Sequence, residues 1–359
     1  MFASRRAALR PMLEPIGVDA LLVTDLTNVR YLTGFTGSNA ALLVHRDGDE
    51  LSSFCTDGRY REQSAREVPD LRRIEDRGCA LRLAKEAAGT VNRLGFESDA
   101  VTVDAHLGLV DAAGPARLLR APGLAQRLRA VKDDAEVDTL RRACAAADAA
   151  LADLLAAGGV RAGRTELEIA VDLEARMRGH GAAGPSFDTI VAGGPHSAIP
   201  HHQPTDRPLR DGDFLKLDFG ALVDGYHSDM TRTLVLGRAA DWQRELYALV
   251  AAAQRAGTAA LAPGVEVSRV DEASRAVVRD AGRADDFPHG LGHGVGLQIH
   301  EAPALAATGT GTLAGGMVLT VEPGVYLAGR GGVRIEDTLV VRNGEPELLT
   351  RTTKELIEV

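Results

Sequence analysis

The chain has 359 residues, of which 45% are apolar and 25% are charged. These proportions are typical of a soluble globular protein and exclude a disordered or collagen-like chain. At about 150 residues per domain, the length predicts roughly two domains. The formal net charge of −9 argues against nucleic-acid binding, because basic surfaces are what bind phosphate groups.

Cysteine usage and hydropathy predict a cytoplasmic protein. The sequence has 3 cysteines and no Cys-x-x-Cys motif, which supports neither a disulfide framework nor a zinc ribbon. The N-terminal stretch contains no apolar run of the length found in signal peptides. No segment approaches the roughly 20 apolar residues that cross a bilayer, so we expect no membrane partner.

In the N-terminal third, apolar runs alternate with helical stretches. The segments 18–24 (VDALLVT) and 40–45 (AALLVH) predict strands, whereas 62–66 and 80–94 predict helices. This alternation is typical of an α/β domain. The tract 121–128 (APGLAQRL) contains Pro and Gly and predicts a linker.

The rest of the chain begins with a long helix. Asp133 and Glu136 have the spacing of a capping box, and Thr165 and Glu168 have the same spacing before a second helix. Further elements are helices near 242–257 and 268–282 and strands at 214–220, 226–236, 317–321, 333–341 and 347–349. Because these elements do not alternate strictly, we expect an α+β domain. The expected domains therefore span 1–125 and 126–359.

Two aspartates lie in a predicted hairpin, FLKLDFGALVDGYHSDMTRTLVL. With the turn centred between Val223 and Asp224, Asp218 lies directly opposite Asp229. Facing carboxylates on apolar strands repel each other unless a cation lies between them. A different register would turn one aspartate towards water, and this hairpin alone does not decide between the two.

Two glutamates occupy matching positions in a second predicted hairpin. Glu322 ends the strand MVLTVE, and Glu336 lies in GVRIEDTLVV. Their midpoint is Gly329, inside the turn-rich stretch LAGRGG, so the two carboxylates are expected to face each other. Arg334 and Glu336 are two residues apart and share one strand face.

The segment HGLGHGVGLQIHE supplies imidazole groups for the same site. His289, His293 and His300 are all candidates, and the glycines between them allow close approach of the backbone. Carboxylates with one imidazole form an oxygen-rich set that suits two Mn²⁺, Co²⁺, Fe²⁺ or Zn²⁺ ions better than a structural zinc. Bridging carboxylates hold two such ions in hydrolytic sites.

These segments resemble those of the pita-bread metallopeptidases, specifically the Xaa-Pro peptidases prolidase and aminopeptidase P. HGLGHGVGLQIHE is similar to the histidine signature of that family, and LDFGALVDGYHSDMTRT, VEPGVY and RIEDT are similar to its other ligand segments, in the same order. LLVTDLTNVRYLTGFTGSNAALLV and TDGRYREQ resemble its creatinase-like first domain. The resemblance implies an α/β creatinase-like N-terminal domain followed by an α+β pita-bread catalytic domain.

The resemblance also implies a ligand set for two divalent metal ions per chain. The ligands would be Asp218, Asp229, His293, Glu322 and Glu336. Asp229 and Glu336 would bridge the ions, and Glu322 would also accept a proton from the attacking water. Among the metals we expect Mn²⁺ ahead of Co²⁺, Zn²⁺ or Fe²⁺.

Other residues match positions of the family that contact the substrate or support the site. His201, in PHSAIPHHQPTDRPL, and His300 would contact the scissile carbonyl or the leaving proline. Arg334 would tether the site. Phe187 would line the pocket for the residue before proline, although burial in the core explains it equally well. His202 and His227 match no role and are expected to be surface or supporting residues.

The implied substrates are short proline-containing peptides, cleaved between the N-terminal residue and proline. An Xaa-Pro bond lacks the N–H group that general peptidases hold. A strict dipeptidase must bind the free proline carboxylate, commonly with a bidentate Arg. Residues 302–329 contain no Arg, Lys or His, so we expect an aminopeptidase P and keep prolidase as the alternative, with Arg334 or an Arg from elsewhere as its clamp. The family also leads us to expect a homodimer.

Three other readings remain open. A catalytically inactive pita-bread binding protein is expected to have lost ligands, and this chain retains the whole set. A creatinase-type amidinohydrolase works without metal and does not need that set. A methionine aminopeptidase generally lacks the creatinase-like first domain. The metal content of the purified protein distinguishes these readings.

Overall fold

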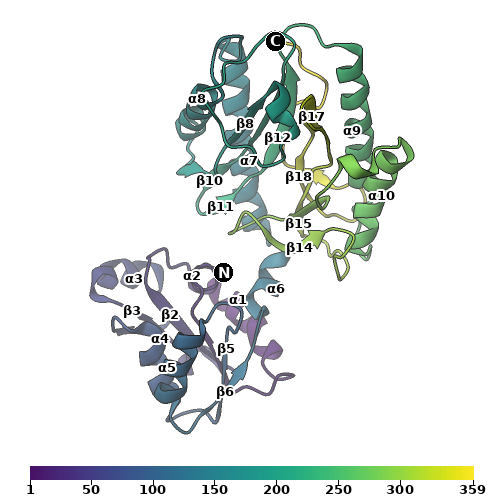
Figure 1. Ribbon diagram of the computed structural model, residues 1–359. Coiled ribbons are helices and arrows are strands. Elements are labelled where there is room, and N and C mark those ends of the chain that lie inside the picture. Colours follow the sequence, from purple (N-terminus) through teal and green to yellow (C-terminus); the bar gives the residue numbers. More distant parts are fainter. The chain divides into compact units, whose positions relative to one another are not determined.

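The computed structural model describes all residues, 1–359, and divides into two compact units, Met1–Arg129 and Ala130–Val359 (Figure 1). The tract 121–128, expected as a linker, forms most of helix α6 (Leu124–Ala130). Leu124 and Ala125 are buried, and Pro122 and Gly123 stand before the helix rather than inside it. The Pro-Gly signal therefore marks the turn before this helix, and the apolar residues that follow it are buried.

The first unit contains a mixed sheet of six strands in the order β4-β3-β2-β1-β5-β6. The strands are β1 (Ala20–Val23), β2 (Ala40–His45), β3 (Ser53–Thr56), β4 (Arg72–Glu75), β5 (Arg93–Phe96) and β6 (Arg117–Arg120). The helices are α1 (Phe2–Leu9), α2 (Leu26–Thr33), α3 (Arg61–Glu67), α4 (Cys79–Ala87) and α5 (Val103–Ala113), with short 3₁₀ turns η1 (Arg10–Met12), η2 (Asp49–Leu51) and η3 (Gly58–Tyr60). The predicted α/β class is confirmed.

One expected helix of this unit is shorter than predicted. The helix expected over 80–94 ends at Ala87, and β5 begins at Arg93. Gly89 and Thr90 follow the helix, and neither favours its continuation. Leu83 of α4 and Leu94 of β5 both belong to the buried core, so this apolar stretch serves a helix and then a strand.

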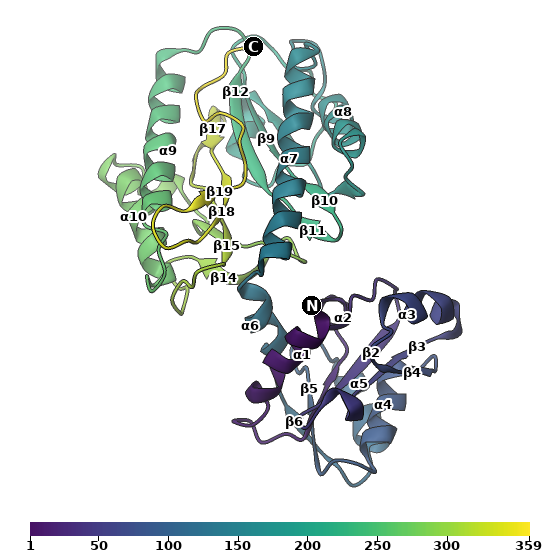
Figure 2. The ribbon, with the colours of Figure 1, turned by 180° about the vertical axis from the view of Figure 1, so that it is seen from behind.

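The second unit carries its sheets between two pairs of helices (Figures 1 and 2). The helices are α7 (Asp134–Ala156), α8 (Glu166–Gly179), α9 (Asp241–Ala259) and α10 (Val267–Asp280), with 3₁₀ turns η4 (Gly194–Ala198) and η5 (Ala284–Asp286). The strands are β7 (Gly184–Pro185), β8 (Ile190–Gly193), β9 (Phe214–Phe219), β10 (Ala221–Val223), β11 (Tyr226–His227), β12 (Met230–Val235), β13 (Gly292–Gly294), β14 (Glu301–Leu305), β15 (Val318–Val321), β16 (Gly324–Leu327), β17 (Gly331–Arg334), β18 (Asp337–Val340) and β19 (Glu347–Leu348). This is the expected α+β arrangement.

Both predicted capping boxes are present. The Asp133 side chain accepts a hydrogen bond from Glu136 N at the start of α7, and Thr165 does the same for Glu168 N at the start of α8. Helix α7 packs against β10 and β11 and helix α8 against β7 and β8. Their apolar faces join one core cluster with β9, in which Leu151, Leu173 and Leu217 are fully buried. None of the helices has the length and apolar character needed to span a lipid bilayer.

The register of the first hairpin differs from the expected one. Asp224 (φ 48°) and Gly225 (φ 77°) both adopt left-handed conformations, so they form the turn themselves, as Asp-Gly pairs favour. As a result Asp218 pairs with Thr231, and the expectation that it lies directly opposite Asp229 is wrong. Asp229 precedes Thr231 by two residues, and both aspartates line the same cavity.

The second hairpin has the expected register. Val321 of β15 pairs with Asp337 of β18, and the same register continues through β16 and β17. Glu322 and Glu336 stand at facing positions between these paired segments. The hairpin therefore brings two glutamates together, one from each strand.

Candidate metal centre

A cavity of about 850 Å³ in the second unit contains the residues singled out in the sequence. Strands and loops from well-separated parts of the chain contribute to it. The expected site residues that line it are Phe187, His201, Asp218, Asp229, His293, His300, Glu322, Arg334 and Glu336. The fold thus brings the whole candidate set to one place.

The two aspartates are almost fully buried. Asp218, in β9, is 7% exposed, and Asp229, immediately before β12, is 4% exposed. The Arg334 guanidinium donates a hydrogen bond to Asp218 Oδ2. Asp218 Oδ1 is buried and has no hydrogen-bond partner.

The two glutamates follow a similar pattern. Glu336, between β17 and β18, is 1% exposed, and its Oε2 accepts a hydrogen bond of 2.6 Å from Thr231 Oγ1. Glu336 Oε1 is buried without a partner. Glu322 follows β15, and its Oε1 accepts a hydrogen bond of 3.1 Å from Thr320 Oγ1.

His293, in β13, points one ring nitrogen at these carboxylates. Its Nε2 lies 3.3 Å from Glu322 Oε1 and 3.6 Å from Asp229 Oδ2. Its Nδ1 lies 3.1 Å from Gly294 O, a contact that favours the Nδ1–H tautomer and leaves the Nε2 lone pair for a ligand. One ligand atom from each of Asp229, His293 and Glu336 lies within 4.8 Å of the others.

The four clustered carboxyl groups repel one another when ionised, and this repulsion favours a bound cation. Burial, and then the charges of Glu336 and Asp218, raise the pKa of Asp229 well above its usual range. Burial, and then the charge of Glu322, do the same to the pKa of Glu336. Burial also raises the pKa of Glu322, but the neighbouring His293 and Arg334 outweigh it and bring that pKa to about 2. Arg334 alone does not neutralise four clustered carboxyl groups.

The residues present fit divalent metal ions. Two buried carboxylate oxygens, Asp218 Oδ1 and Glu336 Oε1, lack partners, although buried polar atoms are normally hydrogen-bonded. A set of carboxylates with one imidazole suits Mn²⁺, Fe²⁺, Co²⁺ or Zn²⁺.

Comparison with known proteins agrees with this geometry. Residues 138–343 match the model of metallopeptidase family M24, and residues 5–131 match the creatinase/prolidase N-terminal domain. The chain belongs to metallopeptidase family M24. It carries the creatinase-like first domain and pita-bread second domain of the prolidase and aminopeptidase P branch, and it is a metallo-exopeptidase.

Individual relatives of this peptidase match it over nearly the whole chain. An Xaa-Pro dipeptidase of Pyrococcus furiosus is 32% identical over 356 residues, covering 98% of this chain and 99% of its own. The structure of an Xaa-Pro dipeptidase from Bacillus anthracis matches with a TM-score of 0.95 at 36% identity, covering 100% of both chains. An X-Pro aminopeptidase from Thermotoga maritima matches with a TM-score of 0.89 at 31% identity, covering 99% of both.

Around the carboxylates, the peptidase has a chain of hydrogen bonds that sequence reasoning missed. Arg334 Nη1 donates to Tyr326 Oη at 2.8 Å, and Tyr326 Oη lies 2.9 Å from His289 Nε2. Burial raises the pKa of Tyr326 to about 12, so its hydroxyl is neutral and donates to His289. The only signal for Tyr326 was its place in VEPGVY, four residues after Glu322.

Two further histidines of the peptidase lie at the cavity. His300 is exposed, and its ring meets that of His293 edge-on with centroids 4.4 Å apart. Partial desolvation against the neighbouring side chains, and then the charge of His293, lower the pKa of His300. His201 is exposed and follows Pro200. Phe187 is half-buried and lines the same cavity, so it is not a core residue.

The histidines without an expected role have structural partners. His227 contacts Ser186 Oγ at 3.0 Å and Ser186 O at 2.9 Å. His202 is 8% exposed and lies 2.9 Å from Glu166 Oε2. It is therefore a buried supporting residue rather than a surface one.

Proposed function

We propose that this peptidase binds two divalent metal ions, with Mn²⁺ preferred, through Asp218, Asp229, His293, Glu322 and Glu336. The observation that carries the proposal is the pair of buried, unpartnered oxygens, Asp218 Oδ1 and Glu336 Oε1. They lie in the cavity where His293 Nε2 faces the carboxylates. In this assignment Asp229 and Glu336 serve both ions.

The proposed reaction is hydrolysis of the bond between an N-terminal residue and proline. Bound divalent ions supply Lewis acidity and make a water molecule acidic enough to react at neutral pH. Glu322 accepts the proton that this water loses. His201 and His300 line the cavity, where they contact the scissile carbonyl oxygen or the leaving proline, and a histidine at the carbonyl donates a hydrogen bond to that oxygen as it gains charge.

The leaving group explains the need for histidine. The prolyl nitrogen departs as a secondary amine and has to be protonated. We assign this proton to His201 or His300, which both line the cavity. Arg334 holds Asp218 in place and is a supporting residue in this scheme. Phe187 forms part of the wall that meets the side chain before proline.

A peptide pair tests the proposed bond specificity. An Xaa-Pro-Yaa peptide and its Xaa-Ala-Yaa counterpart differ only in the ring that removes the N–H group. We expect cleavage of the first and little cleavage of the second. Equal kcat/KM values for the two peptides would overturn the Xaa-Pro assignment.

For substrate length, we propose that the enzyme accepts Xaa-Pro-Yaa and longer peptides, as an aminopeptidase P does. Arg334 is the only Arg or Lys lining the cavity, and it is 2% exposed and engaged with Asp218. A strict dipeptidase activity is the second candidate, favoured by the relatives from Pyrococcus furiosus and Bacillus anthracis named Xaa-Pro dipeptidase.

We further propose a homodimer that works in the cytoplasm. In the first unit Val103, Leu107 and Val110 are 79%, 60% and 46% exposed. They follow one another at helical spacing along α5, which gives a second copy an apolar face to cover. The cysteines are all free, as in proteins of reducing compartments. Light scattering on the native protein and on Leu107→Glu tests the dimer, which the substitution should dissociate.

A further inference from the structure

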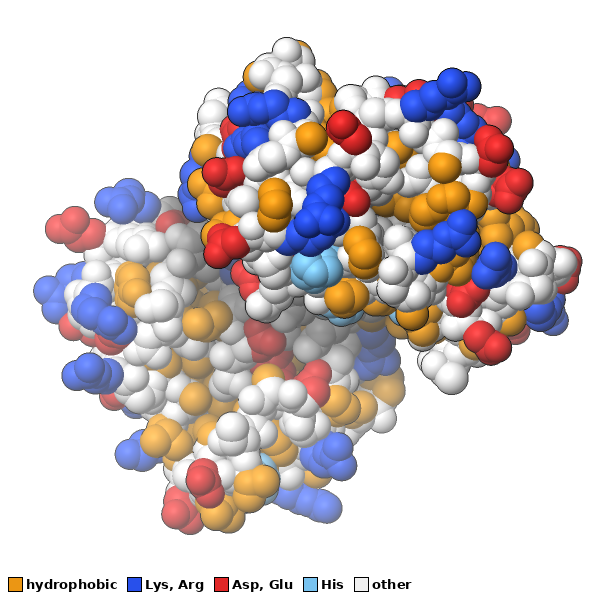
Figure 3. Space-filling model, turned by 45° about the horizontal axis from the view of Figure 1, so that its top comes forward, with side chains coloured by type: hydrophobic (Ala, Val, Ile, Leu, Met, Phe, Trp, Pro, Cys, Tyr) orange, Lys and Arg blue, Asp and Glu red, His pale blue; other side chains and the backbone are white.

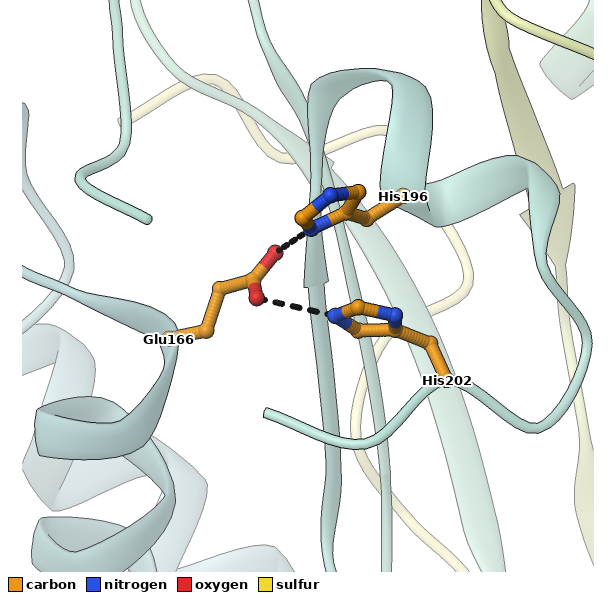
Figure 4. A group of neighbouring side chains, drawn as sticks. All are labelled: Glu166, His196 and His202. Atoms are coloured by element: carbon orange, nitrogen blue, oxygen red, sulfur yellow. Dashed lines mark hydrogen bonds and ion pairs between the residues drawn. The ribbon is translucent and has the colours of Figure 1, made fainter. Parts of the chain in front are cut away.

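Glu166, the first residue of α8, is a fully buried carboxylate outside the proposed ligand set. Figure 4 shows its two oxygens pointing at two imidazole rings. Its Oε1 lies 2.8 Å from both Gly193 N and His196 Nδ1. Its Oε2 lies 2.9 Å from His202 Nε2, 3.0 Å from Thr205 N and 2.7 Å from Thr205 Oγ1.

These contacts keep Glu166 ionised in the interior. Burial by itself raises the pKa of a carboxyl group. Here the donors from Gly193, His202, Thr205 and His196 outweigh burial and lower the pKa of Glu166. A carboxylate that accepts this many hydrogen bonds has its charge well compensated.

The same three side chains, Glu166, His196 and His202, have the composition of a metal site. Their hydrogen bonding argues for a different role. Both oxygens of Glu166 are already occupied by N–H and O–H donors, two of them from the backbone. Asp218 Oδ1 and Glu336 Oε1, in contrast, lack partners. A metal ion at Glu166 would have to displace these hydrogen-bond donors. A metal ion at Glu336 Oε1 would displace none.

The donors to Glu166 lie at both ends of one loop. Gly193 and His196 precede residues 197–201, and His202 and Thr205 follow them. Between these anchors, Lys216 Nζ donates to Ile199 O at 2.6 Å and to Pro200 O at 3.0 Å. The loop is therefore held at its beginning, its middle and its end.

His201 lies in this loop and depends on it for its position. Its side chain is exposed, lines the cavity and makes no hydrogen bond within the protein. The flanking residues Pro200 and His202 are both held, the first by Lys216 and Arg334 and the second by Glu166. The backbone of His201 is thus held on both sides, which sets the direction of its Cα–Cβ bond and the place from which the imidazole reaches the cavity.

We propose that Glu166 is a positioning residue, which orients His201 towards the substrate by holding the loop that carries it. The proposal rests on the function assigned above, in which His201 contacts the scissile bond. Misplacing a reacting group by about 1 Å can cost a factor of about 100 in rate. Glu166 therefore acts on the reaction through His201 and not through the metal ligands.

A double-mutant cycle tests this proposal on the full-length, metal-loaded enzyme. Glu166→Gln keeps the shape of the side chain but replaces one carboxylate oxygen with an amide NH₂ group. That group cannot accept hydrogen bonds and faces the N–H and O–H donors that the oxygen had bound. We expect it to lower kcat/KM for an Xaa-Pro-Yaa peptide between about tenfold and about a hundredfold. In a His201→Ala background the same substitution should cost less than about twofold, because the group it positions is gone.

Glu168→Gln is the matched control. It makes the same chemical change on the same helix, and glutamine satisfies a capping box as glutamate does. We expect it to leave kcat/KM and metal content unchanged. A comparable loss in this variant would mean that the helix, rather than the loop, is responsible, and would overturn the proposal.

Further outcomes separate the alternatives. An equal loss from Glu166→Gln in both backgrounds would overturn the positioning role while leaving the proposed function intact. Loss of a metal ion on Glu166→Gln would make the cluster a metal site and would also overturn it. If His201→Ala alone had no effect on rate, both the proposal and the role of His201 in the proposed function would fail.

A milder variant covers the case in which Glu166→Gln does not fold. Thr205→Val removes the hydroxyl donor at 2.7 Å and keeps the other contacts of Glu166. We expect a loss of a few-fold in kcat/KM that disappears in the His201→Ala background. No loss in the otherwise unmodified enzyme would contradict the proposal.

Discussion

Arg334 donates a hydrogen bond to Asp218 Oδ2 while the other oxygen of that carboxylate, Oδ1, has no partner. The guanidinium also donates to Tyr326 Oη and to Pro200 O. One buried cation thus fixes the orientation of an aspartate and leaves its second oxygen for another positive charge.

Arg334→Lys should lower metal affinity or kcat/KM by about 10- to 100-fold, as is usual for residues that orient metal ligands. Lysine keeps the charge but cannot donate to Asp218, Tyr326 and Pro200 from one planar group. Metal content after dialysis and steady-state kinetics measure the two effects. Arg330→Lys, near the turn between β16 and β17, is the control and should change neither quantity.

Glu336→Gln should stabilise the metal-free protein and abolish metal-dependent stabilisation. The raised pKa of Glu336 means that the folded state holds a proton that the unfolded state releases above a pH of about 4.3. The free energy of unfolding of the metal-free wild type therefore falls as the pH rises above that value, and glutamine removes this penalty.

Thermal unfolding of chelated protein between pH 5 and pH 8 checks this expectation. Glu336→Gln should unfold at least about 2 °C higher than wild type at pH 7, with a smaller difference at pH 5. Adding metal at 100 times its Kd should stabilise wild type by about 2.7 kcal/mol and the variant hardly at all. The exposed Glu345→Gln serves as the control, and a similar shift there would remove the link to the metal cluster.

His201→Ala and His300→Ala should each lower kcat by about 10²- to 10³-fold, the usual cost of removing a donor to a developing oxyanion. Neither residue belongs to the proposed ligand set, so metal content should stay that of wild type. Plasma mass spectrometry and kinetics on the same samples measure both. A variant that loses its metal would show that the histidine is a ligand.

Substrate length separates the two candidate specificities. We expect kcat/KM for an Xaa-Pro-Yaa tripeptide to equal or exceed that for the matching Xaa-Pro dipeptide, since Arg334 is engaged with Asp218. A preference of about a hundredfold for the dipeptide, equivalent to ~2.7 kcal/mol of transition-state binding, would instead reveal a carboxylate clamp and an Xaa-Pro dipeptidase.

The sequence predicted the parts of the site whose partners are close in the chain. The facing positions of Glu322 and Glu336 follow from a short hairpin with a recognisable turn, and the capping boxes follow from residues three apart. The first hairpin was placed two residues out of register because the turn was centred before Asp224 rather than at Asp224-Gly225. That pair adopts left-handed conformations readily, which was the missed signal.

Other features had no local signal. Glu166 contacts His202 across 36 residues of sequence, and Arg334 contacts Asp218 across 116. Such pairs form only when the tertiary fold brings distant elements together. Tyr326 and Lys216 likewise looked like ordinary strand residues, because their hydrogen-bond partners come from other elements.

The most direct test of the account is a metal titration of the chelated enzyme, in which bound metal and the rate of Xaa-Pro-Yaa cleavage are measured on the same samples. We predict that the metal-free enzyme is inactive and that activity rises with added Mn²⁺ until two ions per chain are bound. Full activity in a demonstrably metal-free sample, or no Xaa-Pro cleavage at full occupancy, would contradict it.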